Sequence, residues 1–249
     1  MKYIGIDLAW TEKNETGLCV LGDGGAAERL EAARFSLGEL ADLIRSFGRE
    51  ELTIAVDAPL LVRNETGSRT AERELVRDRI HGNRLNAFMA SRSFLNRRFG
   101  GLRGEDLVRE IQSVRPDLPL NRRTDRGGLY ETFPTGICCG LFPDLYPLRY
   151  KRKRGMSPED SLAEMKRLKA RLKEWEEAGI LSGVTDRLGL PEGTPGGKEL
   201  KHLEDRIDGF LCALGAFIPR RLAVEERSYG TPAEGAIILP VLRDRADLR

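Results

Sequence analysis

Apolar and polar positions follow two periods along the chain, which separate predicted strands from predicted helices. Alternating runs, and short continuous apolar runs between turn residues, predict strands at 2–9, 16–21, 28–35, 52–57, 128–133, 222–226 and 236–242. Apolar positions at helical spacing predict helices at 37–47, 71–80, 104–115, 158–178 and 198–217. Ser36 with Glu39, and Ser157 before Pro158, are typical of helix starts.

The order of these elements predicts one α/β domain over residues 1–249. Three antiparallel strands followed by a helix and a strand open the ribonuclease H-like fold, so we expect a mixed five-stranded sheet of that class with flanking helices. The last two short strands finish the core. The stretches at about 63–126 and 145–197 are rich in basic and helical sequence, and we predict them as insertions. A chain of 249 residues is long enough for such a domain.

Composition narrows the class of protein. Hydrophobic residues make up 40% and charged residues 32% of the chain, which predicts a packed core under a well-charged surface. No apolar run approaches the length of a membrane span, and Asp7 interrupts the apolar stretch near the N-terminus, so we expect neither membrane insertion nor a signal peptide. Because the net charge is only +2, a nucleic-acid surface would have to come from local clusters of basic residues.

Cysteine and histidine usage limits the compartment and the possible metals. Cys19, Cys138, Cys139 and Cys212 form no CxxC pair, which predicts buried thiols in a reducing cytoplasm. Two histidines are few for a zinc site of the usual His and Cys ligands. Any metal would therefore be held mainly by oxygen, as Mg²⁺, Mn²⁺ and Ca²⁺ prefer.

Acidic residues stand at unusual positions in the predicted strands. Asp7 shares a strand face with Gly5, which leaves room for another element to approach. Asp57 closes the next apolar run, at the end of a strand where α/β folds place their sites, although Asp before Ala-Pro is also a common local turn. Glu131 interrupts an apolar strand face, where it would be a site residue, or a structural residue if an arginine pairs with it.

The helix predicted at 198–217 carries two further acids. Asp205 and Asp208 are three residues apart and lie nearly opposite the apolar stripe of this helix. A solvated face is the ordinary interpretation of such acids, but this face continues with small residues such as Gly209 and Cys212 rather than with lysine and glutamate. Small residues let a helix pack closely on a sheet, so we predict that both aspartates project toward the strand ends.

Several carboxylates within a few ångströms repel one another unless a cation lies between them. Mg²⁺ and Mn²⁺ suit such an all-oxygen site, and two such ions can activate water and stabilise the leaving oxygen in phosphodiester cleavage. We therefore predict Asp7, Asp57, Asp205 and Asp208 as ligands of Mg²⁺ or Mn²⁺ in a nuclease, with Glu131 as a further ligand or water-orienting base. A glycosidase pair would not need acids spread over strands and a helix.

Four segments, in order over nearly the whole chain, carry a family resemblance. They are Ile4-Gly5-Ile6-Asp7-Leu8-Ala9-Trp10, Val56-Asp57-Ala58-Pro59, Tyr130-Glu131-Thr132-Phe133-Pro134-Thr135-Gly136 and His202-Leu203-Glu204-Asp205-Arg206-Ile207-Asp208-Gly209. Together they resemble the DUF429 family, which implies a ribonuclease H-like core, an acidic metal site and nuclease activity on nucleic acid. The helix aspartates also resemble those of the Holliday-junction resolvase branch. That motif usually continues with alanine, where this chain has Gly209.

Two other functions fit parts of the sequence. Phosphotransferases of the actin, heat-shock and sugar-kinase type also open with Ile-Gly-Ile-Asp, but they carry a glycine-rich phosphate turn where this chain has Leu8-Ala9-Trp10-Thr11, and they need a second domain. A non-catalytic protein of the same fold that binds nucleic acid or another partner is the second alternative. DNA, RNA, a branched junction and a small nucleotide are all candidate substrates.

Basic residues cluster in the predicted insertions. The run at 149–154, and the arginines at 92, 97, 98, 103, 122 and 123, would either follow phosphates or form a solvated surface. Few aromatic residues are interleaved with them, so the sequence does not strongly indicate stacking on single strands.

Overall fold

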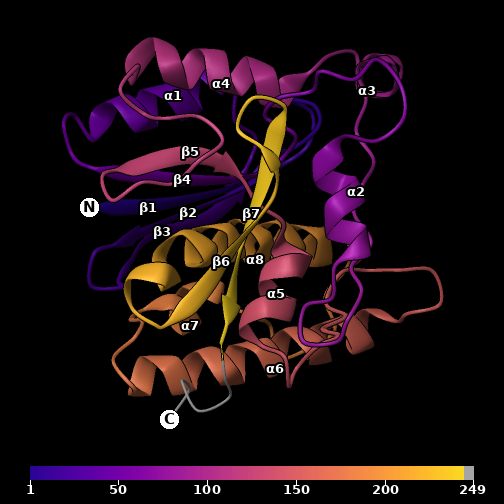
Figure 1. The fold of residues 1–249 in the computed structure, drawn as a ribbon. Coiled ribbons are helices and arrows are strands. Elements are labelled where there is room, and N and C mark those ends of the chain that lie inside the picture. The colour runs from indigo at the N-terminus through magenta and orange to yellow at the C-terminus, as the bar shows by residue number, and fades with distance from the viewer. Residues whose placement is uncertain (244–249) are drawn as a thin grey trace.

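The computed structural model describes residues 1–243, in which helices cover both faces of a seven-stranded mixed sheet (Figure 1). In chain order the elements are β1 (Lys2–Asp7), β2 (Thr16–Gly22), β3 (Ala27–Ala33), α1 (Leu37–Ser46), β4 (Leu52–Asp57), α2 (Thr70–Arg77), α3 (Arg92–Phe99), α4 (Arg103–Val114), β5 (Gly127–Glu131), α5 (Pro134–Leu141), α6 (Pro158–Glu177), α7 (Val184–Leu188), α8 (Gly197–Phe217), the 3₁₀ turn η1 (Ile218–Arg220), β6 (Val224–Thr231) and β7 (Gly235–Leu242).

The strands lie in the order β3-β2-β1-β4-β5-β7-β6. β1, β2 and β3 form an antiparallel meander, and β4 and β5 continue the sheet parallel to β1. The predicted mixed α/β sheet is confirmed, but its predicted five strands are wrong. The sheet has seven because β7 continues it beyond β5 and β6 pairs with β7. In the parallel pair of β1 and β4, Asp7 is the registered partner of Asp57, so both strands end at one edge of the sheet.

The two faces of the sheet have separate apolar cores. Ile4 and Ile6 of β1 face α1 and α4, where they pack with Leu40 and Ile111. Tyr3 belongs to the other core, which α5, α6 and α8 cover, as Figure 1 shows below the sheet. The alternation in the first strand predicted that another element would approach the face that Asp7 shares with Gly5. This prediction is confirmed, because that face of β1 lies against α8.

Local sequence signals account for several helix boundaries. Ser36 accepts a hydrogen bond from the backbone N–H of Glu39, whose carboxylate accepts one from the Ser36 N–H at 2.8 Å, so the predicted capping box is present. Ser157 caps α6 in the same way with Asp160. The helices α3, α5 and α7 were not predicted, and the strand predicted at 128–133 ends earlier because Pro134 begins α5.

The strand predicted at 222–226 is longer and begins later, as β6. After Val224 its residues are mostly polar, and Glu225 and Glu226 are exposed, so the register with β7, rather than an apolar pattern, defines its length. Both predicted insertions lie within the described residues and supply helices: α2, α3 and α4 in the first, α6 and α7 in the second. No helix of the described part of the chain is long and apolar enough to cross a membrane.

Candidate metal centre

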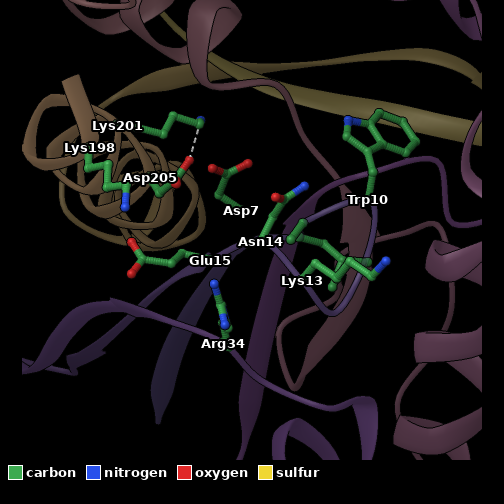
Figure 2. Close-up of a pocket in the computed structure, with 11 residues that line it drawn as sticks. Asp7, Trp10, Lys13, Asn14, Glu15, Arg34, Lys198, Lys201 and Asp205 are labelled. Atoms are coloured by element: carbon green, nitrogen blue, oxygen red, sulfur yellow. Dashed lines mark hydrogen bonds and ion pairs between the residues drawn. The ribbon is translucent and has the colours of Figure 1, made fainter.

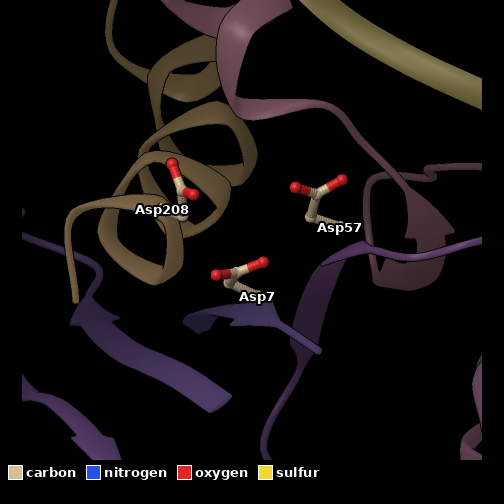
Figure 3. A group of neighbouring side chains, drawn as sticks. All are labelled: Asp7, Asp57 and Asp208. Carbon is tan, nitrogen blue, oxygen red and sulfur yellow. The ribbon is translucent and has the colours of Figure 1, made fainter. Parts of the chain in front are cut away.

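Three aspartates from three elements face one another at the edge where β1 and β4 end. Asp7 is the last residue of β1, Asp57 is the last residue of β4, and Asp208 lies on α8 beside them (Figure 3). Each residue offers one carboxylate oxygen, and these three oxygens all lie within 4.8 Å of one another. Asp208 is buried, and the other two are partly buried. The fold thus brings together three of the five acids predicted as site residues.

Close packing of α8 on β1 and β2 fixes the position of its aspartates. A Cβ atom on Gly5 would lie 2.1 Å from the carbonyl oxygen of Gly209, and one on Gly17 would lie 1.8 Å from the carbonyl oxygen of Asp205. A Cβ atom on Gly209 would lie 2.5 Å from the carbonyl carbon of Gly17. These approaches leave no room for side chains, which explains why glycine stands where the resemblance implies alanine.

Burial and mutual repulsion raise the pKa of these carboxyl groups. Burial is the largest cause at Asp7, whose pKa lies well above its usual range, and the charges of Asp208 and Asp57 raise it further. Burial also raises the pKa of Asp57 to about 7, with Lys151 opposing the rise and Asp208 adding to it. A cation among the three carboxylates would favour their ionised forms and remove this repulsion.

Two residues of the second insertion contact Asp208. The Tyr150 hydroxyl donates a hydrogen bond to Oδ1 of Asp208, and the Nζ atom of Lys151 lies 2.7 Å from Oδ2. Burial opposes the charge of Lys151, but Asp208 and the other two aspartates raise its pKa, so it is a cation beside the three carboxylates. The basic run at 149–154 therefore reaches the site itself as well as the surface.

Asp205 lies one turn before Asp208 and lines a neighbouring cavity of about 460 Å³ (Figure 2). Asp7 lines the same cavity, so the cavity opens beside the three aspartates. Asp205 is hydrogen-bonded to Lys201 and lies outside the group of three. Burial raises its pKa, and the contact with Lys201 opposes that rise.

Glu131 is held in a buried ion-pair network. Arg69 donates to both of its carboxylate oxygens, at 2.6 and 2.8 Å, and also pairs with Glu72 at 2.7 Å. The Leu60 N–H donates to Oε2 of Glu131 at 3.4 Å. Glu131 is only 5% exposed and is not part of the group of three. Of the two interpretations that the sequence left open, the geometry matches the arginine-paired one.

Comparison with known families identifies the family of this chain. The sequence profile of DUF429, a family described as proteins of unknown function, matches residues 5–233. The chain belongs to the DUF429 family. The matched range contains the three aspartates of the site, and the resemblance stated from the sequence is confirmed. Searches of curated proteins and of solved structures found no match.

The donor set of this DUF429 protein fits a divalent cation that prefers oxygen. Within residues 1–243, Asp7, Asp57 and Asp208 form the one group of three or more acidic, histidine or cysteine residues whose ligand atoms lie this close together. All four cysteines are free and buried. Carboxylate oxygens are the ligands that Mg²⁺ and Mn²⁺ take in proteins, and a cation would relieve the raised pKa values at this site.

Four contacts of the DUF429 site were not predicted. Lys201 precedes Asp205 by four residues, a helical spacing that could have identified the pair. Tyr150 is an aromatic residue inside a basic run, which is the one signal that the run turns inward. Lys151 carries no signal that separates it from its basic neighbours. Arg69 lies 62 residues from Glu131, so local sequence could not pair them.

Proposed function

We propose that this DUF429 protein is a Mg²⁺- or Mn²⁺-dependent nuclease with a ribonuclease H-like core, which hydrolyses phosphodiester bonds in nucleic acid. The observation that carries the proposal is the convergence of Asp7, Asp57 and Asp208. The strand order β3-β2-β1-β4-β5, with carboxylates at the ends of adjacent parallel strands, supports the assignment of the core.

The residues of the site divide the work of hydrolysis. A divalent cation, when bound, would neutralise charge on the phosphoryl oxygens and lower the pKa of a bound water molecule. Asp7, Asp57 and Asp208 would hold this cation, and the Tyr150 hydroxyl fixes the orientation of Asp208 by its hydrogen bond. Lys151 provides a positive charge at the same place, where it can meet a phosphate.

The proposed partner is nucleic acid, and the support for it is the charge around the site. The segment that carries Lys151 to Asp208 leaves Arg152, Lys153 and Arg154 exposed, without ion pairs to residues 1–243, and surface cations of this kind bind phosphate backbones. A cytoplasmic setting also stays a proposal, and its support is that all four cysteines are free.

A cleavage screen tests the proposal. Structured and unstructured DNA and RNA are incubated with Mn²⁺ and the wild-type protein, Asp7→Asn or Asp208→Asn. We expect the wild type to cleave. Each substitution should lower the activity by more than the roughly 10–100-fold that is lost when a residue contacting a metal ligand is replaced. Asp186→Asn, an exposed acid on α7, is the matched control and should cleave normally.

Three results would contradict the proposal. Equal activity in Asp7→Asn would remove the three aspartates from the reaction. Nucleic-acid binding that survives both substitutions, without cleavage by any form, would favour the non-catalytic alternative. Micromolar ATP binding in calorimetry would instead favour a phosphotransferase.

A further inference from the structure

An aromatic cluster of Trp10, Phe88, Phe94 and Phe99 lies beside the candidate metal centre. The Trp10 and Phe99 rings stack at 4.5 Å with planes 10° apart, and the Phe88 ring lies 5.1 Å from Trp10 and 5.4 Å from Phe94. Phe88 is 46% exposed, so part of the cluster faces solvent. Trp10 lies after β1, and the other three rings come from residues 88–99, where they are interleaved with the arginines at 92, 97 and 98.

Two rings of the aromatic cluster, Trp10 and Phe99, line adjacent cavities, and Phe88 and Phe94 line neither of them. The cavity of about 460 Å³ is lined by Asp7 and Asp205, and a second cavity of about 580 Å³ is lined by Phe99. Trp10, Lys13 and Arg34 line both cavities, so they form neighbouring compartments. Their volumes fall in the range of roughly 300–1,000 Å³ that is typical of small-ligand sites.

Cations without acidic partners line the first cavity. Lys13, Arg34 and Lys198 form no ion pair with any residue of the described range 1–243. Figure 2 shows Lys198 and Lys201 on one side of Asp7, with Trp10 on the other side. Unpaired cations close to acids of the metal centre favour a ligand that carries negative charge along its length and must also approach the carboxylates.

We propose that the two compartments bind an unpaired stretch of nucleic acid. One base stacks on the exposed Phe88 ring, which contacts Trp10, and the flanking phosphates contact Lys13, Arg34 and Lys198. An unpaired base is required because its flat face must be free to stack on an aromatic ring. This inference rests on the proposed function, since the bound strand would run from the aromatic cluster to the three aspartates that cleave it.

Fluorescence anisotropy in EDTA tests binding without cleavage. The probes are labelled DNA and RNA strands of one sequence, each tested as a single strand and as a duplex. Comparison of the DNA and RNA probes also shows which nucleic acid binds more tightly. We expect single strands to bind more tightly than duplexes. Phe88→Ala removes one base–aromatic stack, so it should weaken single-strand binding about fivefold or more without changing duplex binding.

Matched variants separate stacking from general effects. Phe88→Tyr keeps an aromatic ring and should restore binding, and Val76→Ala, at an exposed apolar residue of α2, should change nothing. Lys13→Gln and Lys198→Gln should each reduce the salt dependence of single-strand binding by about 0.7 in the log–log slope. The two tryptophans are Trp10 and the buried Trp175, so fluorescence quenching by a bound strand should disappear in Trp10→Phe.

The outcomes distinguish this inference from the proposed function. Selective single-strand binding that depends on Phe88, in a protein that never cleaves, would uphold the inference and end the proposed function. Cleavage that depends on Asp7, combined with equal affinity for duplex and single strand and a neutral Phe88→Ala, would overturn the inference and leave the proposed function intact.

Discussion

Asp57 links the stability of the metal-free protein to pH. Burial raises its pKa to about 7 from the usual 3.8 of an aspartate, so between these values the folded state holds a proton that the unfolded state has lost. The free energy of unfolding therefore falls as pH rises through this window. We expect Asp57→Asn to raise the melting temperature at pH 8 in EDTA and to change it little near pH 4.

Thermal unfolding across that pH range measures the effect. The exposed substitution Asp186→Asn is the control, because it removes one negative charge away from the site. A gain of the same size at both ends of the range would show that Asp57 ionises normally. The affinity for Mn²⁺ should rise with pH, whereas the free energy of unfolding falls. It should weaken below about pH 7, because a protonated carboxyl group cannot bind the metal.

Lys151 supplies a positive charge of the protein itself at the same site. Its ammonium group lies 2.7 Å from Asp208 and offsets part of the charge of the three aspartates. Lys151→Met keeps most of the side-chain volume and removes this charge, so the metal-free protein should melt at a lower temperature at pH 8. Mn²⁺ should bind more tightly, because the cation that it must displace is gone, and calorimetry would measure the change. Weaker Mn²⁺ binding would instead show that Lys151 helps to hold the site together.

At the scale of elements, the contact of α8 with β1 and β2 controls the geometry of the site. Gly209→Ala would place a methyl group 2.5 Å from the backbone of Gly17, so α8 must move. We expect a loss of about 1–3 kcal/mol in unfolding free energy, as for other overpacked sites, together with weaker Mn²⁺ binding because Asp208 moves with the helix.

Gly24→Ala is the matched control for this substitution. A Cβ atom there would meet nothing within 4 Å, so its unfolding free energy and Mn²⁺ affinity should match the wild type in denaturant titration and calorimetry. A stable Gly209→Ala protein with unchanged Mn²⁺ affinity would mean that α8 does not position Asp208.

Elements with strong local patterns were predictable, and long-range pairings were not. The small residues opposite the apolar stripe of α8 predicted its close packing and the direction of Asp208, and the alternation in β1 predicted the face of Asp7. The edge strand β6 is polar, so only its pairing with β7 defines it. The partner of Glu131 comes from a distant helix start, and no local pattern could show it.

At the scale of the whole molecule, the Arg69 network ties the first insertion to the sheet. Its guanidinium group joins Glu72 at the start of α2 to Glu131 at the end of β5, and all three side chains are almost fully buried. Arg69→Met would leave two buried acids unpaired, so we expect a loss of about 3–5 kcal/mol in unfolding free energy. Denaturant titration measures it, and the exposed Arg73→Met on α2 is the control. Wild-type stability in Arg69→Met would show that neighbouring groups compensate these acids.

Metal binding should stabilise the whole fold, because its ligands come from three elements that are far apart in the sequence. Asp7, Asp57 and Asp208 lie on three elements that separate when the protein unfolds, so the site exists only in the folded state. Mn²⁺ at a hundred times its dissociation constant would add about 2.7 kcal/mol. In a protein of this length each kcal/mol shifts the melting temperature by about 2–4 °C, which gives a rise of about 5–11 °C. The rise should be absent in Asp208→Asn and in NaCl of equal ionic strength. An equal rise in Asp208→Asn would mean that the ion binds elsewhere on the protein.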